Sequence, residues 1–166
     1  MGGTELKLVL VRVDDRLIHG QVVLGWTRAV SANRIVVADN ATANDSMQQT
    51  LLKMAAPSGV KVSILTTDEA GEQLSSSTFK GENVMVLVRG PEALLDLKKA
   101  GVEFSKVNVG NVRAAEGRKR ITKEVHASPE EMNAWKQLAD QGITLEAQWV
   151  PDQRKTRLND IFAKQG

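Results

Sequence analysis

The chain has 166 residues, 42% of them hydrophobic and 25% charged, with a net charge of +2, proportions that suit one soluble domain over residues 1–166. No apolar run approaches the roughly 18 residues of a membrane-spanning helix, and the N-terminus lacks a secretion signal. The absence of cysteine excludes disulfides, thiolate chemistry and zinc–thiolate sites, and it suits a reducing cytoplasm.

Short apolar runs alternate along the chain with segments of helical periodicity, which is typical of repeated βαβ units. We expect strands at Leu6–Val13, Arg34–Ala38, Val60–Leu65, Val84–Val88, Lys106–Val109, Arg120–Val125 and Thr144–Val150. Helices fill the gaps. The predicted fold is α/β: an open, twisted, mainly parallel sheet of about six to seven strands, with room for one antiparallel strand and with helices on both faces.

Two of the expected helices are amphipathic, and their apolar faces should belong to the core. On the first helix this face comprises Val22, Val23, Trp26, Ala29 and Val30; on the second it comprises Met47, Leu51, Met54 and Ala55. Two later helices show start signals. Pro91 suits the first position of a helix that reaches Ala100, while Ser128 and Glu131 match a capping box.

The turn after the first strand carries the residues with the clearest chemistry. Asp14, Asp15 and Arg16 precede His19, which lies at the start of the first helix. Backbone N–H groups in a first helical turn are unpaired and face the positive end of the macrodipole, so a phosphoryl group is readily held there. Arg16 could add a planar guanidinium, and a neutral imidazole offers a nucleophilic lone pair.

Residues at the ends of other strands should meet this turn. In an open parallel sheet, ligand chemistry collects at the carboxyl edge. The strand-end residues are Asp39, Thr66, Arg89, Gly110 and Asn111, and we expect them at the same edge as the loop from Asp14 to His19.

Several of these residues also have purely structural interpretations. A loop histidine can be a surface or capping residue, and Asp39 can end a strand and cap the next helix near Asn44. Arg12 can form a salt bridge with Asp14 or Asp39, or act in the site. His126 is expected to be exposed or to cap a helix.

Other catalytic signatures do not occur in the sequence. There is no Gly-rich dinucleotide fingerprint, phosphate-binding P-loop or Gly-x-Ser-x-Gly elbow. Two distant histidines without cysteine form no recognisable metal cluster. We therefore expect neither a metal nor a cofactor.

The segment from Leu8 to Val23 resembles the active-site loop of IIB components of the mannose/fructose/sorbose sugar phosphotransferase system. The resemblance extends over essentially the whole chain, through Asp39-Asn40, Arg89-Gly90-Pro91, Val107 to Asn111 and Trp149-Val150-Pro151. Asn111 is a small departure, because many relatives have glycine there.

This resemblance implies a phosphocarrier. His19, at Nδ1, would accept a phosphoryl group from a phosphorylated IIA domain and pass it to a sugar presented by membrane IIC and IID subunits. Arg16 would stabilise phosphoryl charge, and Asp14 or Asp15 would orient the site. The other residues expected to hold phosphate or substrate are Asp15, Gly20, Gln21, Asp39, Gly110 and Asn111. The protein would be cytoplasmic and peripherally bound to the permease, and a homodimer is reasonable.

The sequence leaves open which residues form the docking surface for a IIA partner. Leu17 and Ile18 could contact a partner or turn inward, and the basic residues between Arg113 and Lys123 could meet an acidic IIA face or only water. An alternative function is a regulatory or nucleic-acid-binding module. The mild charge and 4% aromatic content argue against nucleic-acid binding, and intact His19 and Arg16 argue against a degenerate carrier kept only for regulation.

Overall fold

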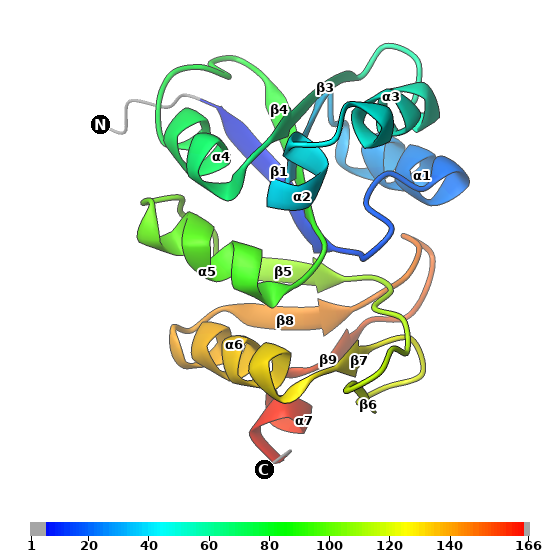
Figure 1. The fold of residues 1–166 in the computed structure, drawn as a ribbon, viewed down its shortest axis with the longest axis vertical. Helices are drawn as coiled ribbons and strands as arrows, with labels where there is room; N and C mark the ends of the chain where they lie inside the picture. Colours follow the sequence, from blue (N-terminus) through cyan, green and yellow to red (C-terminus); the bar gives the residue numbers. More distant parts are fainter. Residues whose placement is uncertain (1–5, 165–166) are drawn as a thin grey trace.

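The computed structural model describes residues 6–164, so both ends of the expected domain, 1–5 and 165–166, lie outside the described residues. Its main sheet contains seven strands in the order β3-β2-β4-β1-β5-β8-β9 (Figure 1). Their bounds are β1 Lys7–Val13, β2 Arg34–Ala38, β3 Lys61–Leu65, β4 Asn83–Val88, β5 Lys106–Val109, β8 Thr144–Ala147 and β9 Thr156–Arg157. All neighbours pair in parallel except β8 and β9, which confirms the expected fold class.

Helices cover both faces of the sheet, and the sheet divides the core into two layers. Their bounds are α1 Gly20–Val30, α2 Asn40–Ala43, α3 Ser46–Ala55, α4 Thr67–Leu74, α5 Pro91–Lys99, α6 Pro129–Asp140 and α7 Asn159–Lys164. One layer contains apolar residues of α4, α5, α6 and α7, and the other contains those of α1 and α3. Both capping predictions for α5 and α6 hold: Pro91 occupies the first turn of α5, and Ser128 and Glu131 form a capping box. Within residues 6–164, no helix is long and apolar enough to span a membrane.

The expected strand at Arg120–Val125 is wrong. Only β6 (Lys119–Arg120) and β7 (His126–Ala127) pair, as a separate antiparallel hairpin. Between them, the N–H groups of Ile121 and Thr122 both donate to the carbonyl oxygen of Val125, so the segment closes on itself as a turn. The last parallel strand is also shorter than expected, ending at Ala147.

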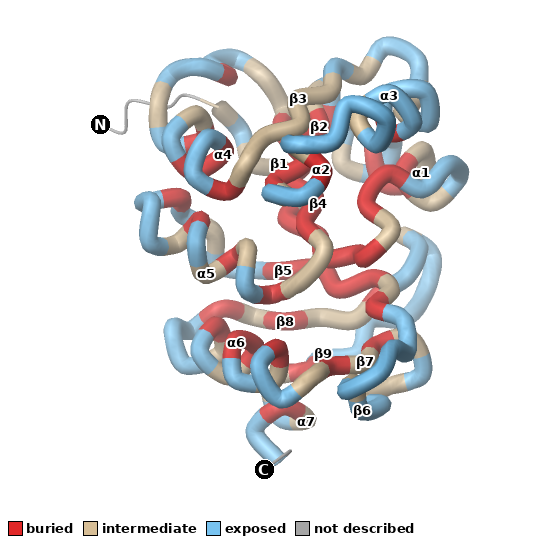
Figure 2. Tube along the Cα trace, in the orientation of Figure 1, coloured by how far each residue is buried: buried red, intermediate tan, exposed pale blue. Residues whose placement is uncertain are grey.

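The expected core face of α3 is wrong as well. Met47, Leu51 and Met54 are 72%, 53% and 78% exposed, and Figure 2 shows almost all of α3 in the exposed colour. Leu52 is the buried residue that α3 contributes to the core layer beneath α1. The helical period identified an apolar face correctly, but that face points away from the sheet.

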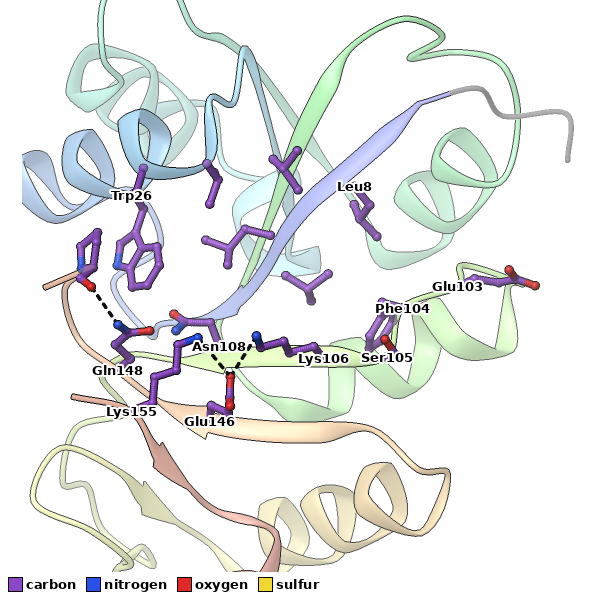
Figure 3. A pocket seen from close by; sticks show the side chains of 16 residues that line it. Leu8, Trp26, Glu103, Phe104, Ser105, Lys106, Asn108, Glu146, Gln148 and Lys155 are labelled. Atoms are coloured by element: carbon purple, nitrogen blue, oxygen red, sulfur yellow. Dashed lines mark hydrogen bonds and ion pairs between the residues drawn. The ribbon is translucent and has the colours of Figure 1, made fainter. Parts of the chain in front are cut away.

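A groove of about 620 Å³ opens beside α1, over β1, β5 and β8 (Figure 3). Glu146 lies on its floor and forms ion pairs with Lys106 and Lys155. Trp26, Asn108 and Gln148 line one end of the groove. The side chains of Trp26 and Asn108, and the backbone carbonyl of Gln148, also contact Arg12 beneath the turn that follows β1.

Candidate functional site

Asp14 shapes the turn between β1 and α1. Its carbonyl oxygen accepts a hydrogen bond from the N–H of Leu17 at 2.9 Å, and its Oδ1 accepts one from the N–H of Arg16 at 3.0 Å. The chain then enters the left-handed region at Leu17, where φ is 57°. A short acidic side chain that bonds to the backbone two residues on is a common way to stabilise such a turn.

Leu17 and Ile18 turn inward, so the alternative in which they contact a partner is wrong. They are 0% and 5% exposed and pack in the layer that contains Trp26 and Leu52. A left-handed conformation costs a leucine about 1–2 kcal/mol. Burying its side chain stabilises the fold by about 1.5–3 kcal/mol, so burial outweighs the strain.

Arg16 and His19 face each other at the end of this turn. Nη1 of Arg16 lies 3.1 Å from Nε2 of His19. Because a guanidinium only donates hydrogen bonds, Nε2 must accept, and the ring proton of neutral His19 is therefore on Nδ1. Nε of Arg16 lies 3.7 Å from Oδ1 of Asp14, and buried Nη2 has no hydrogen-bond partner among residues 6–164. His19 itself is exposed.

Arg12 is a buried cation beneath the turn. It is 1% exposed, and its Nη2 donates to Oδ2 of Asp14 at 3.2 Å. It also donates to the Asn108 side chain and to the carbonyl oxygens of Gln148 and Trp149. Burial lowers the pKa of Arg12 to about 10, against the opposing effect of Asp14, so the group stays charged at neutral pH.

Gly110 packs against the Arg12 guanidinium so closely that a larger side chain would not fit. A Cβ atom on this residue would collide with the Arg12 guanidinium and would come 2.9 Å from Oδ2 of Asp14. Its neighbour Asn111 contributes a backbone carbonyl that accepts a hydrogen bond from Asp15 at 2.9 Å. Both residues therefore support the turn from below.

Asp15 points away from Arg16 and toward the segment after β5. Its carboxylate accepts hydrogen bonds from the backbone N–H and the Nε of Arg113, at 2.9 and 3.2 Å. Nη1 of Arg118 lies 3.7 Å from the same carboxylate, while Nε and Nη2 of Arg118 bind Glu131 at 3.0 Å each. Of the two aspartates, Asp14 is therefore the one that orients Arg16.

Asp39 caps a helix and also holds an arginine. Its carboxylate accepts from the N–H of Thr42 in α2 and from Nε of Arg89, at 3.1 and 3.2 Å. Nη1 of Arg89 donates to the carbonyl oxygen of Asp15 at 2.7 Å. Asp39 thus reaches the turn through Arg89, and Asp14 rather than Asp39 is the partner of Arg12.

The remaining expected residues occupy two different settings. Gly20 and Gln21 are exposed in the first turn of α1, and Gly20 has a φ of 35°, which favours glycine. His126 neither caps a helix nor is exposed: its half-buried ring bonds through Nδ1 to the carbonyl oxygen of Val112. Residues 6–164 contain no cluster of three or more metal-binding side chains.

Sequence reasoning did not assign Trp149 to the site. Its ring centroid lies 5.8 Å from the guanidinium carbon of Arg16, and its carbonyl oxygen binds Arg12 and Trp26. The only signal in the sequence was the Trp149-Val150-Pro151 motif. Because this turn follows β8, its position beside β1 depends on the strand order.

Comparison with known proteins identifies relatives over nearly the full chain. A family model described as the PTS system sorbose subfamily IIB component matches residues 8–166. The fructose-specific EIIB component of Bacillus subtilis is 36% identical, over 88% of this chain and 90% of that protein. The mannose-specific EIIAB component of Escherichia coli is 32% identical over 99% of this chain, which spans 51% of that longer protein. The crystal structure of the IIB domain of the Klebsiella pneumoniae sorbose permease superposes with a TM-score of 0.91 at 30% identity, over 96% and 98% of the two chains.

Proposed function

Since the chain belongs to the sorbose subfamily of IIB components of the sugar phosphotransferase system, we propose that His19 is the residue through which it carries a phosphoryl group. The chain is a sugar phosphotransferase component, which is a transferase role. The single observation that supports His19 is its contact with Arg16, whose Nη2 has no partner within residues 6–164.

Each group at the turn would have a distinct role in accepting the phosphoryl group. A ring nitrogen of His19 attacks phosphorus, and the N–P bond of the donor phosphohistidine breaks with its electron pair returning to the donor ring. His19 loses its ring proton to solvent and the donor ring gains one, which balances the step. Arg16, held by Asp14, neutralises the phosphoryl oxygens together with the free N–H groups of Gly20 and Gln21.

The contact with Arg16 leaves two routes for this attack. Nε2 carries the lone pair, so it can attack once Nη1 of Arg16 moves to an incoming phosphoryl oxygen. Alternatively, the ring changes tautomer and Nδ1 attacks, as the family resemblance implies. Either route frees Arg16 from the ring and brings it onto the phosphoryl group.

The wider role follows from the relatives. One relative is named as a combined EIIAB component, which supports a IIA domain as the donor and a single IIB domain over residues 1–166. The acceptor would be a sugar presented by membrane IIC and IID subunits, with the protein bound at the cytoplasmic side of the permease. We expect no cofactor and no nucleic-acid partner, and we propose that two copies pair.

Phosphoryl transfer from labelled phosphoenolpyruvate tests this function directly. The general phosphotransferase proteins and a mannose-type IIA domain supply the label, and the wild-type chain is compared with His19→Ala. We expect acid-labile, alkali-stable label on the wild type alone. His126→Ala is the matched control, because it removes the other histidine and should leave the label in place.

Two results would refute the role of His19. One is label on the His19→Ala variant equal to that on the wild type, and the other is no label on the wild type while the IIA domain is fully phosphorylated. Once the wild type carries label, addition of membranes that contain IIC and IID should transfer that label to sugar.

A further inference from the structure

Trp149 is exposed, yet its backbone is held firmly. The residue is 39% exposed, but its carbonyl oxygen accepts hydrogen bonds from Trp26 at 2.8 Å and from buried Arg12 at 2.9 Å. Its N–H donates to the side chain of Gln153. Trp26 and Gln148, the residue before Trp149, both line the groove drawn in Figure 3. The backbone of Trp149 is therefore fixed while its indole stays accessible.

The indole of Trp149 is continuous with the candidate site. It lies over Arg16, and Arg16 contacts His19. Val150, also 39% exposed, extends the apolar surface by one residue. A folded protein that brings a histidine ring against His19 must therefore lie against this surface as well.

We propose that Trp149 anchors the protein that donates the phosphoryl group, so that Trp149, Val150, Arg16 and exposed Arg113 form its docking surface. The proposal rests on the proposed function. Binding energy in protein interfaces concentrates in tryptophan and arginine, and a segment whose backbone is already fixed loses less entropy on binding. The expected partner is a IIA domain that presents phosphohistidine inside an apolar rim that covers the indole.

The donor fits this surface better than the membrane subunits do. In the first step the donor ring must come into line with His19 across the phosphorus atom. A histidine ring on a folded IIA domain brings the surface of that domain with it. Within residues 6–164, the exposed apolar face of α3 is not among the partners given by the contacts of Arg16, which are His19 and Trp149 on this side of the turn.

The test compares Trp149→Ala and Trp149→Phe with the matched control Met54→Ala, which removes an apolar side chain that is 78% exposed. Calorimetry gives the Kd for the unphosphorylated IIA domain, and initial rates of labelling give the KM for phospho-IIA. We expect Trp149→Ala to raise both constants by about tenfold or more, as for an interface hot spot. Trp149→Phe should raise them by less than Trp149→Ala does, because it keeps an aromatic ring, and Met54→Ala should have no effect.

Labelling by phosphoramidate distinguishes a loss of donor docking in Trp149→Ala from a loss of Arg16 positioning. This small donor phosphorylates histidine with loss of ammonia and needs no protein surface. Trp149→Ala should lose at least about five times more reactivity with phospho-IIA than with phosphoramidate, given the hot-spot effect expected above. Equal losses with both donors would overturn the proposal, because the indole would then act only through Arg16.

A weaker Kd for Met54→Ala with an unchanged Kd for Trp149→Ala would also overturn the proposal and would place the donor on α3. If the wild type receives no label at all, the proposed function fails, and the Kd values still decide where the IIA domain binds.

Discussion

At the scale of single residues, Arg16 is held by two different constraints. Asp14 fixes its backbone through a hydrogen bond of 3.0 Å, and the indole of Trp149 lies 5.8 Å from its guanidinium carbon. The guanidinium reaches His19 with one nitrogen and keeps Nη2 free of hydrogen bonds within residues 6–164. A planar donor group placed in this way suits the oxygens of an arriving phosphoryl group.

Arg16 variants should therefore lose transfer rate more than stability. We expect Arg16→Met to lower the initial rate of labelling by about 10²-fold, as for loss of one preorganised donor, and Arg16→Lys to lower it less because a point charge remains. The measurement is labelling by phospho-IIA under saturating donor, with circular dichroism to check the fold. A labelling rate in Arg16→Met within twofold of the wild type would rule out this role for Arg16.

The sequence predicted which residues lie near the turn better than it predicted what each one contacts. Asp14 and Gly110 lie at or beneath the turn and Asp39 is linked to it through Arg89, since parallel strands end at one edge of the sheet. The partner of Arg12 could not be chosen from the sequence, because Asp14 and Asp39 are both acidic residues at strand ends. Trp149 was missed because its contacts join residues 137 and 123 positions apart.

At the scale of elements, the parallel strands β1 to β5 were predictable to within one residue at each end, and the two-residue strands were not. β2 and β5 have the predicted bounds, since each is a short apolar run between turn signals. β6, β7 and β9 have two residues each, which is too short to show a periodicity. For α3, periodicity revealed an apolar face but could not show what that face would contact.

The start of α6 provides a test of stability against pH. Burial would raise the pKa of Glu131, but hydrogen bonds from Arg118 and from the backbone of Ser128 outweigh it, and the pKa is lowered. Ionised Glu131 therefore stabilises the folded state above the ordinary glutamate pKa of about 4.3, and this contribution disappears as the pH falls below that value. We expect Glu131→Gln to lower the free energy of unfolding by about 1–2 kcal/mol at pH 7.

Urea unfolding at pH 7 and pH 3 measures this difference. The gap between wild type and Glu131→Gln should narrow strongly at pH 3. Glu130→Gln is the matched control, since Glu130 is exposed in the same first turn and should change stability little at either pH. A gap of the same size at both pH values would show that the ionised carboxylate is not what stabilises the start of α6.

At the scale of the whole molecule, Arg12 joins segments that are far apart in the sequence. It starts on β1 and binds Asn108 of β5 and the carbonyl oxygens after β8, at separations of 96 to 137 residues. Arg12→Met would remove these bonds and leave the Asp14 carboxylate buried beside an apolar side chain. Loss of one partner of a buried ion pair typically lowers the free energy of unfolding by about 3–5 kcal/mol.

Equilibrium unfolding in urea tests this prediction, with Arg28→Met as the control because Arg28 is an exposed basic residue of α1. We expect a large loss for Arg12→Met and less than about 0.5 kcal/mol for Arg28→Met. Similar losses in the two variants would mean that Arg12 is held in place by the fold without stabilising it.

The strand order also has a consequence for synthesis on the ribosome. β1 precedes the other strands of residues 6–164, yet it lies between β4 and β5 and pairs with residues 83–88 and 108–109. β1 therefore waits for residues 83–88 before it can pair on one edge, and for residues 108–109 before it can pair on the other. Pairing between such distant segments is slow and leaves strands open to aggregation in the meantime. Nascent chains that stop before residue 106 should accordingly be the ones that chaperones bind most strongly.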